Sequence, residues 1–299
     1  VAALNGMEWL DTSRAACTLL AQGELERADR LLEGFSTEEA LKAVLSSSEP
    51  ATLSLLHARP WLITHECDGR PVLAWLASAG WSAAVRHCLA TPVNWGGRPG
   101  DFSLALLFAA AMGRSAVVEM LLDDGRADPG NETGGGAFAL LLAAQNGHAE
   151  VVHLLLADGR AAPEQKTEDG ALPLLQAAQN GHTEVVQLLL ADGRARPDQV
   201  DKQDGTFPLL QAAQSGHAEV VQLLLADGRA DPDHEREHDG AFPLLVAAEN
   251  GRAGVVQLLL ADGRARPDRV RKNYGSFPLL MAAQNGHTEV VQLLLADGR

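Results

Sequence analysis

The segment that decides the fold of this chain is Phe207-Pro-Leu-Leu-Gln-Ala-Ala-Gln-Ser-Gly216-His-Ala-Glu-Val-Val-Gln-Leu-Leu-Leu-Ala-Asp-Gly-Arg229. It reads as a short apolar entry, a helix, a glycine turn and a longer helix. The turn glycine recurs at intervals of 33 to 35 residues, at Gly80, Gly113, Gly147, Gly181, Gly216, Gly251 and Gly286. A fixed period in this range is typical of a stacked repeat protein. Such a protein presents a long surface and seldom builds a catalytic pocket. The period therefore predicts a binding protein.

The apolar pattern of one unit explains why several units are needed. The second helix places Val220, Val221, Leu224 and Leu225 on one face, and a pair of alanines lets the first helix approach its neighbours closely. Neither helix can bury that face alone, so we expect the units to stack. The turn residue Gly216 is expected to adopt a backbone conformation that is costly for other residues.

The units resemble ankyrin repeats. The proline and the alanine pair stand where the ankyrin consensus has them, at Pro173, Pro208, Pro243 and Pro278 and at Ala177-Ala178, Ala212-Ala213, Ala247-Ala248 and Ala282-Ala283. The resemblance runs from about residue 68 to the end of the chain. It implies an all-α ankyrin-repeat solenoid with short β-hairpin-like loops between the units.

The chain departs from the ankyrin consensus in two respects. Leucine replaces the family's histidine after Pro-Leu, at Leu175, Leu210, Leu245 and Leu280, so burial is expected to replace hydrogen bonds between repeats. The loops also exceed the consensus by about two residues and are expected to project further than usual. His148, His182, His217 and His287 follow the turn glycine as in the consensus, and we interpret them as structural. Arg160, Arg194, Arg229 and Arg264 are interpreted as a solvated surface ladder whose pairs contribute little to stability.

Residues 1–67 have a sequence pattern typical of helices but lack the repeated motif. They are therefore predicted to form a helical N-terminal cap, for which diverged repeats are one interpretation. Residues 68–299 are then an ankyrin array of about seven units. A capping box at Ser36 and Glu39 predicts a helix over 37–45, and Pro50 predicts another from about residue 50 to residue 58. All five tryptophans lie in the first third of the chain, at 9, 61, 75, 81 and 95. They are predicted to seal the cap; the alternative is an aromatic anchor for a partner.

Composition narrows the function classes. The net charge of −15 disfavours nucleic acid and anionic membrane surfaces as partners. Three cysteines without paired spacing indicate a reducing compartment, and no apolar stretch is long enough to span a membrane. We therefore expect a cytoplasmic, monomeric protein. Because the sequence begins with valine and stops within the repeated phrase, we also expect it to be a fragment of a longer protein.

The sequence predicts no catalytic residue, cofactor or metal site. His234, Glu235 and His238 have ligand-like spacing, but they lie in a loop without a third ligand. His65 and Cys67 place an imidazole near a thiol, yet catalytic partners are usually brought together from distant segments.

Partner-binding residues are sought where the copies differ. By resemblance to ankyrin proteins, the variable positions on the first helices line a concave groove: Gln176, Gln179, Gln211, Gln214, Val246, Glu249, Met281 and Gln284. Glutamine offers adaptable hydrogen bonding without fixed charge. The alternative is that these side chains are merely solvated.

The last inter-repeat loop is basic in an otherwise acidic protein. It supplies the second group of candidate partner-binding residues, Arg269, Arg271, Lys272 and Tyr274. Positive charge beside the only tyrosine of the chain is a composition favoured at interfaces. The alternative is a solvated loop that has drifted in sequence.

These observations predict a non-enzymatic scaffold that binds a partner protein through its groove and hairpin tips. Near-identical repeats with long loops are similar to bacterial and viral arrays that act on host proteins, so a microbial effector working in the host cytosol is one hypothesis. The alternative is the substrate-targeting arm of an enzyme whose catalytic domain lies outside these residues. A purely structural spacer is the third hypothesis.

Overall fold

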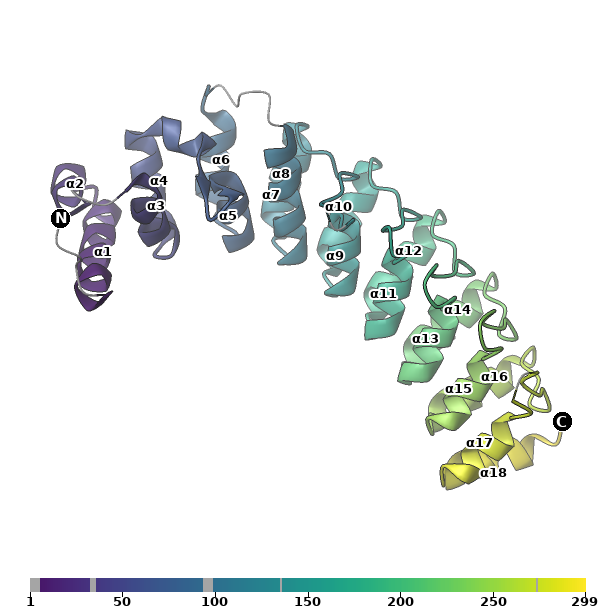
Figure 1. Ribbon diagram of the computed structural model, residues 1–299. Helices are drawn as coiled ribbons and strands as arrows, with labels where there is room; N and C mark the ends of the chain where they lie inside the picture. The colour runs from purple at the N-terminus through teal and green to yellow at the C-terminus, as the bar shows by residue number, and fades with distance from the viewer. Residues whose placement is uncertain (1–5, 33–35, 94–98, 135, 273) are drawn as a thin grey trace. The chain divides into compact units, whose positions relative to one another are not determined.

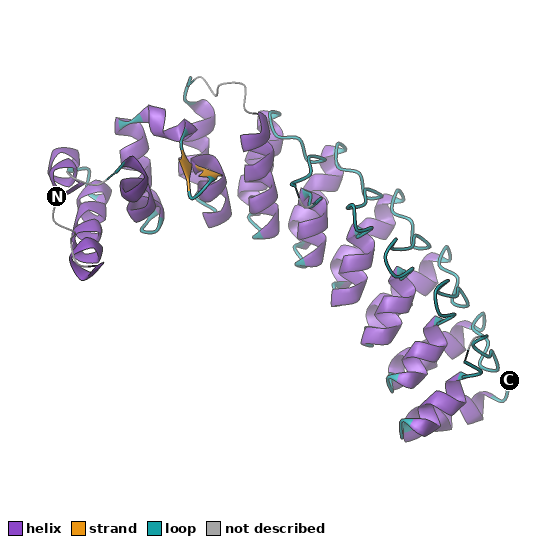
Figure 2. Ribbon diagram, in the orientation of Figure 1, coloured by secondary structure: helices purple, strands orange, loops and turns teal. Residues whose placement is uncertain are grey.

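The computed structural model describes residues 6–32, 36–93, 99–134, 136–272 and 274–299. Within these ranges the chain forms eighteen α-helices, one 3-10 helix and a single two-stranded hairpin (Figure 2). The prediction of an all-α repeat fold is confirmed.

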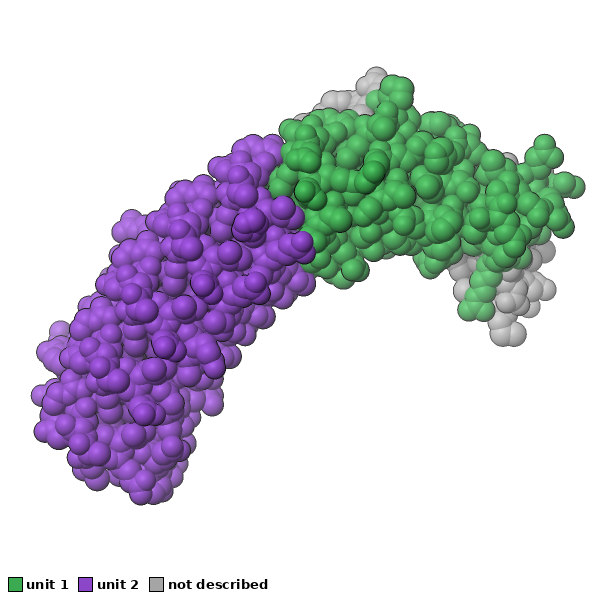
Figure 3. Space-filling model, turned by 180° about the vertical axis from the view of Figure 1, so that it is seen from behind, with its two compact units in different colours: residues 1–131 green, residues 132–299 purple. Residues whose placement is uncertain are grey.

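The chain divides into two compact units, Val1–Asn131 and Glu132–Arg299 (Figure 3). Unit 1 contains α1 Gly6–Ala21, α2 Leu25–Leu32, α3 Thr37–Leu45, α4 Glu49–Ala58, η1 Pro60–Thr64, β1 Glu66–Cys67, β2 Arg70–Pro71, α5 Val72–Ala79, α6 Ser82–Ala90, α7 Pro99–Ala111 and α8 Ser115–Asp124. The predicted boundary between cap and array, at residues 67 and 68, falls in the β1–β2 hairpin inside unit 1 and stays a prediction.

The two helices expected in the cap are present. The Glu39 backbone N–H donates to the Ser36 hydroxyl at 3.2 Å, and the Ser36 backbone N–H donates to the Glu39 carboxylate at 2.8 Å. This reciprocal cap satisfies two donors that have no partner inside the helix, and α3 begins at Thr37 as predicted. The next helix, α4, begins at Glu49, one residue before the predicted Pro50.

The tryptophans of unit 1 differ in their environments. The indole Nε1–H of Trp75 donates to the Cys67 carbonyl at 2.9 Å, which ties α5 to the hairpin. Trp61 is 51% exposed, and its ring meets the His65 ring edge-on, with 4.9 Å between the centroids. The side chains of Trp9 and Trp95 lie outside the described residues. Trp75 is thus packed within unit 1 and Trp61 is exposed, and both the sealing role and the alternative of a partner anchor stay predictions.

Unit 2 is a stack of five helix pairs (Figure 1). First helices pack on first helices and second helices on second helices, which gives two layers. The pairs are α9 Ala139–Gln145 with α10 Ala149–Asp158, α11 Pro173–Asn180 with α12 Thr183–Asp192, α13 Pro208–Ser215 with α14 Ala218–Asp227, α15 Pro243–Glu249 with α16 Ala253–Asp262, and α17 Pro278–Gln284 with α18 Thr288–Asp297.

The core of unit 2 lies between neighbouring pairs. The alanine pair of α13 is fully buried, as are Val220, Val221 and Leu224 of α14. Leu210 and Leu245, at the family's histidine position, are also fully buried. Removing a leucine side chain from water contributes about 1.5–3 kcal/mol, so the predicted exchange of a polar group for burial is confirmed at these two positions.

The expectation that polar bonds between repeats would be lost is wrong. The residue after the turn glycine reaches back to the preceding first helix: His182 donates to the Gln145 carbonyl at 2.9 Å and His217 to the Gln179 carbonyl at 3.0 Å. Arg252 makes the equivalent bond to Gln214, at 3.2 Å. These bonds satisfy carbonyls at the ends of helices, which have no partner within the helix.

The arginine of each Asp-Gly-Arg phrase also ties repeats together. Arg229 grips Asp227 through Nε and Nη2, at 2.7 and 2.8 Å. The same guanidinium donates to the carbonyls of Ala195 and Leu190 in the preceding repeat, at 3.1 and 3.3 Å. Arg194, Arg264 and Arg299 repeat this arrangement. The interpretation of the arginines as solvated pairs alone is therefore wrong for Arg194, Arg229 and Arg264, because they also bridge adjacent repeats.

The paired Asp and Arg side chains of the Asp-Gly-Arg motifs are expected to make the stability of the protein depend on pH in the acid range. Hydrogen bonds from the arginine two residues later lower the pKa of Asp192, Asp227 and Asp262, against the opposing effect of partial burial. A depressed folded-state pKa contributes stability that is present above the unfolded pKa, near 3.9, and is lost as the pH falls through the folded pKa. We expect the urea midpoint to fall below about pH 4. A variant with all three aspartates changed to asparagine should have a lower urea midpoint at pH 7. Its midpoint should also decrease less than that of the unaltered protein as the pH is lowered. Asp268→Asn, at an exposed position, is the control. If the urea midpoint of the triple variant decreases with falling pH as steeply as that of the unaltered protein, the acid sensitivity does not come from these three Asp–Arg pairs.

Gly216 tests the turn geometry. Its φ is +91°, and a Cβ there would lie 2.7 Å from Cδ of Arg252. Gly216→Val should destabilise the fold by more than about 1 kcal/mol, through backbone strain and displacement of Arg252. Gly254 lies inside α16 with open space around it, so Gly254→Ala should stabilise by about 0.5–1 kcal/mol. The urea midpoint is therefore expected to decrease for Gly216→Val and to increase for Gly254→Ala. An unchanged midpoint for Gly216→Val would refute the strain argument.

Candidate functional site

The predicted groove residues lie on the surface of unit 2 formed by α11, α13, α15 and α17, which we call the first-helix face. Gln179, Gln214 and Gln284 are exposed, and Gln176, Gln211, Glu249 and Met281 are half-buried. Val246 is only 5% exposed. The structure therefore places seven of the eight within reach of solvent and makes Val246 part of a wall.

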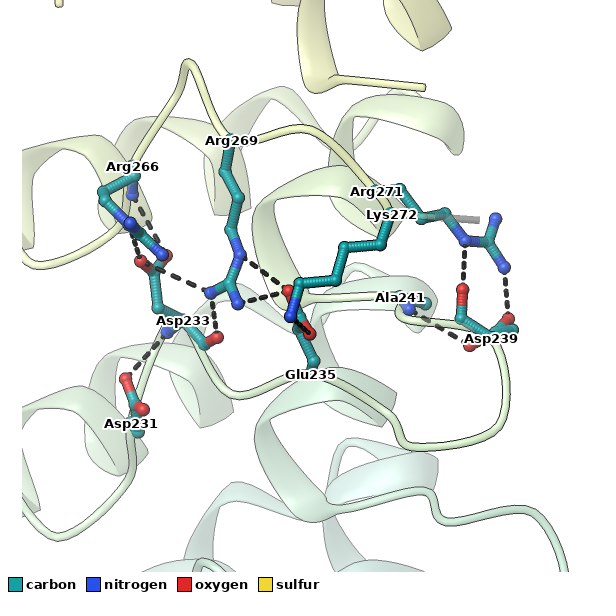
Figure 4. Close-up of polar contacts among 9 residues, drawn as sticks. All are labelled: Asp231, Asp233, Glu235, Asp239, Ala241, Arg266, Arg269, Arg271 and Lys272. Atoms are coloured by element: carbon teal, nitrogen blue, oxygen red, sulfur yellow. Dashed lines mark hydrogen bonds and ion pairs between the residues drawn. The ribbon is translucent and has the colours of Figure 1, made fainter. Parts of the chain in front are cut away.

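The arginines of the basic loop are held by the loop of the preceding repeat (Figure 4). Arg269 donates through Nε to Glu235 at 3.0 Å, and Arg271 donates through Nε to the Asp239 carbonyl at 2.7 Å while Nη2 pairs with the Asp239 carboxylate. Each arginine side chain is 16% exposed. Arg266 joins the same contact through Asp233, at 2.5 Å. The charge reversal in this loop is thus met by complementary charge within the chain.

Three other side chains form the outer surface of this loop. Val270 is 49% exposed, Tyr274 is 68% exposed, and the Lys272 side chain is 81% exposed. The Arg271 guanidinium lies over the Tyr274 ring, with its carbon 4.4 Å from the ring centroid. Of the four predicted tip residues, Lys272 and Tyr274 are therefore the exposed ones.

A cavity of about 340 Å³ opens on the first-helix face, between α13, α15 and the loops that precede α15 and α17. Gln214, Val246 and Glu249 line it together with Arg271. The cavity therefore brings together residues predicted for the groove and one residue predicted for the loop tip.

Two lining residues, Arg236 and Asp239, were not predicted from the sequence. Arg236 binds Asp239 through Nε and Nη2, at 2.9 and 2.7 Å. These hydrogen bonds lower the pKa of Asp239; burial opposes the shift, and the Ala241 N–H and the charge of Arg271 add to it. The sequence did contain a signal that could have identified Arg236. Arg236 and Arg271 occupy the same position in consecutive loops, so an alignment of the repeats places the two arginines side by side.

The other sequence candidates have ordinary packing environments. The His234 ring packs edge-on against Phe207, at 4.6 Å between centroids. Burial raises the pKa of the Cys67 thiol, which is 1% exposed. Within the described ranges no three histidine, cysteine or acidic side chains are grouped to hold a metal ion. No helix in the same ranges combines the length and apolarity needed to cross a bilayer.

Comparison with known families agrees with this geometry. The sequence profile described as "Ankyrin repeats (3 copies)" matches residues 106–201, 140–236 and 209–299, which together cover about two thirds of the chain. The chain is an ankyrin repeat protein. The crystal structure of the human ASB11 ankyrin repeat domain is similar, with 29% identity and a TM-score of 0.63, over 76% of this chain and 98% of that one. No curated protein sequence matches. Ankyrin repeats are generally protein–protein interaction modules, so this ankyrin array has the fold of a binding protein.

The loop-to-loop ion pairs can be measured by a double-mutant cycle. Glu235→Ala, Arg269→Ala and the double variant should show a coupling free energy of about 0.5–3 kcal/mol, because both side chains are largely buried. Arg196 and Asp198 form an exposed pair at 3.6 Å and serve as the control cycle, with an expected coupling of about 0–1 kcal/mol. Equal couplings in the two cycles would show that the loop contact does not stabilise the stack.

Proposed function

We propose that this ankyrin array is a non-catalytic scaffold that binds a partner protein through the first-helix face and the loop tips of unit 2. The observation that carries the proposal is the row of exposed glutamines on successive first helices, Gln179 and Gln214, leading to a polar cavity. The same position is Gln145 and Gln284 in two other repeats and Glu249 in the remaining one, so the row continues along unit 2 with a single change of charge. Adaptable amide groups on a rigid layer suit recognition of another protein.

The setting of this function is also part of the proposal. Cys17, Cys67 and Cys88 are buried and unpaired, which supports a reducing, cytoplasmic compartment. The net charge of −15 supports a protein partner rather than nucleic acid. The near-identical repeats support the narrower hypothesis of a microbial effector acting in a host cytosol.

The chain contains a matched control for the first-helix face. Gln187 and Gln222 are also exposed, but they lie on the second helices α12 and α14. A photo-crosslinking amino acid at 179 or 214 should capture the partner, whereas the same group at 187 or 222 should not. With the captured partner purified, Gln179→Lys should reduce affinity by about tenfold or more, and Gln187→Lys should leave it unchanged. Capture only from the second helices would refute the proposed face.

A further inference from the structure

One side chain that lines the cavity on the first-helix face is shorter than its counterparts in the neighbouring repeats. Val246 occupies the position held by Gln176 and Gln211 in the two preceding repeats and by Met281 in the next. Each of those side chains is longer than valine. Val246 is 5% exposed and forms part of the lining, so we expect a glutamine at this position to extend into the cavity.

One wall of the cavity carries fixed hydrogen-bond donors. Arg236 and Arg271 hold Asp239 from two sides through their Nε and Nη2 atoms. Within the described residues, neither Nη1 group has a partner in the chain. Because the pairing with Asp239 fixes both guanidinium planes, these unused donors are preorganised.

The other lining groups include the Glu249 carboxylate, whose charge is among those that raise the pKa of Arg236. Glu249 uses its backbone carbonyl to accept from His287 and Asn285, and among the described residues its carboxylate makes no hydrogen bond to a cation. The exposed Gln214 amide lies at the same cavity. The charges of the two arginines, Asp239 and Glu249 sum to zero.

We propose that this cavity receives the carboxamide of an asparagine or glutamine side chain in the partner protein. The carboxamide oxygen accepts from the Nη1 groups of Arg236 and Arg271, and its NH₂ donates to Glu249. A carboxylate would satisfy the arginines but repel Glu249, and an ammonium group would satisfy Glu249 but meet two guanidiniums. This inference rests on the proposed function of the first-helix face and names the chemistry that one part of it recognises.

A peptide selection with a matched bait tests the proposal. The full chain is used to select from a random peptide display library, with counter-selection against Val246→Gln, which restores the glutamine of two neighbouring repeats and fills the cavity. Circular dichroism and the urea midpoint verify that this variant is folded. The selected peptides are expected to share an asparagine or glutamine at one position. Their affinity should fall about tenfold or more on Val246→Gln, and equally when that peptide residue is changed to alanine.

Glu249→Gln distinguishes the competing ligands. For a carboxamide, this variant retains an acceptor and should alter affinity by less than about tenfold, with little dependence on salt. A shared acidic residue whose affinity rises on Glu249→Gln, or a shared basic residue whose affinity falls on it, would overturn the proposal. Failure to enrich any peptide over the filled variant would overturn it too. If Gln179→Lys weakens partner binding but Val246→Gln does not, the proposed face stands and the cavity assignment falls.

Discussion

The structure depends on the inability of a single helix pair to bury its own apolar face. The valines and leucines of α14 lie on one side of the helix, and they reach full burial only between neighbouring pairs. Every other feature of unit 2 follows from the need to place the next pair in register. The alanine pairs let first helices approach closely, and positive φ at the turn glycines returns the chain for the second helix.

Burial alone gives little directional control, because apolar contact is not directional. The polar ties supply it. His182, His217, Arg252 and His287, each after a turn glycine, bond the preceding first helix, and the Asp-Gly-Arg arginine bonds carbonyls near the preceding second helix. Both layers are therefore fixed to their neighbours by hydrogen bonds at defined offsets. A stack held in this way offers a rigid surface, which lowers the entropic cost of binding.

The fold could be predicted from the sequence because its signals are local and repeated. The period, the Pro and Ala-Ala positions and the capping box at Ser36 each specify structure within a few residues. The candidate site was harder to predict from the sequence. Val246 lines the cavity with a side chain that is only 5% exposed, and this burial depends on packing between repeats. Arg236 and Asp239 escaped notice because their importance arises from contact with Arg271, 32 to 35 residues away.

The basic loop shows why sequence variation alone does not locate a binding site in a repeat protein. Arg269 stands where the two preceding loops have His234 and Gln199, and this change toward positive charge indicated a partner site. Yet Arg269 and Arg271 pair with the acidic loop beside them. Among near-identical repeats, such complementary loops distinguish the correct neighbour from the others, since like charges placed opposite one another are destabilising. Variation can therefore serve the order of the stack as well as its partner. Exposure separates the side chains of this loop: Arg269 and Arg271 pair with the neighbouring loop and are 16% exposed, whereas Lys272 and Tyr274 are largely exposed.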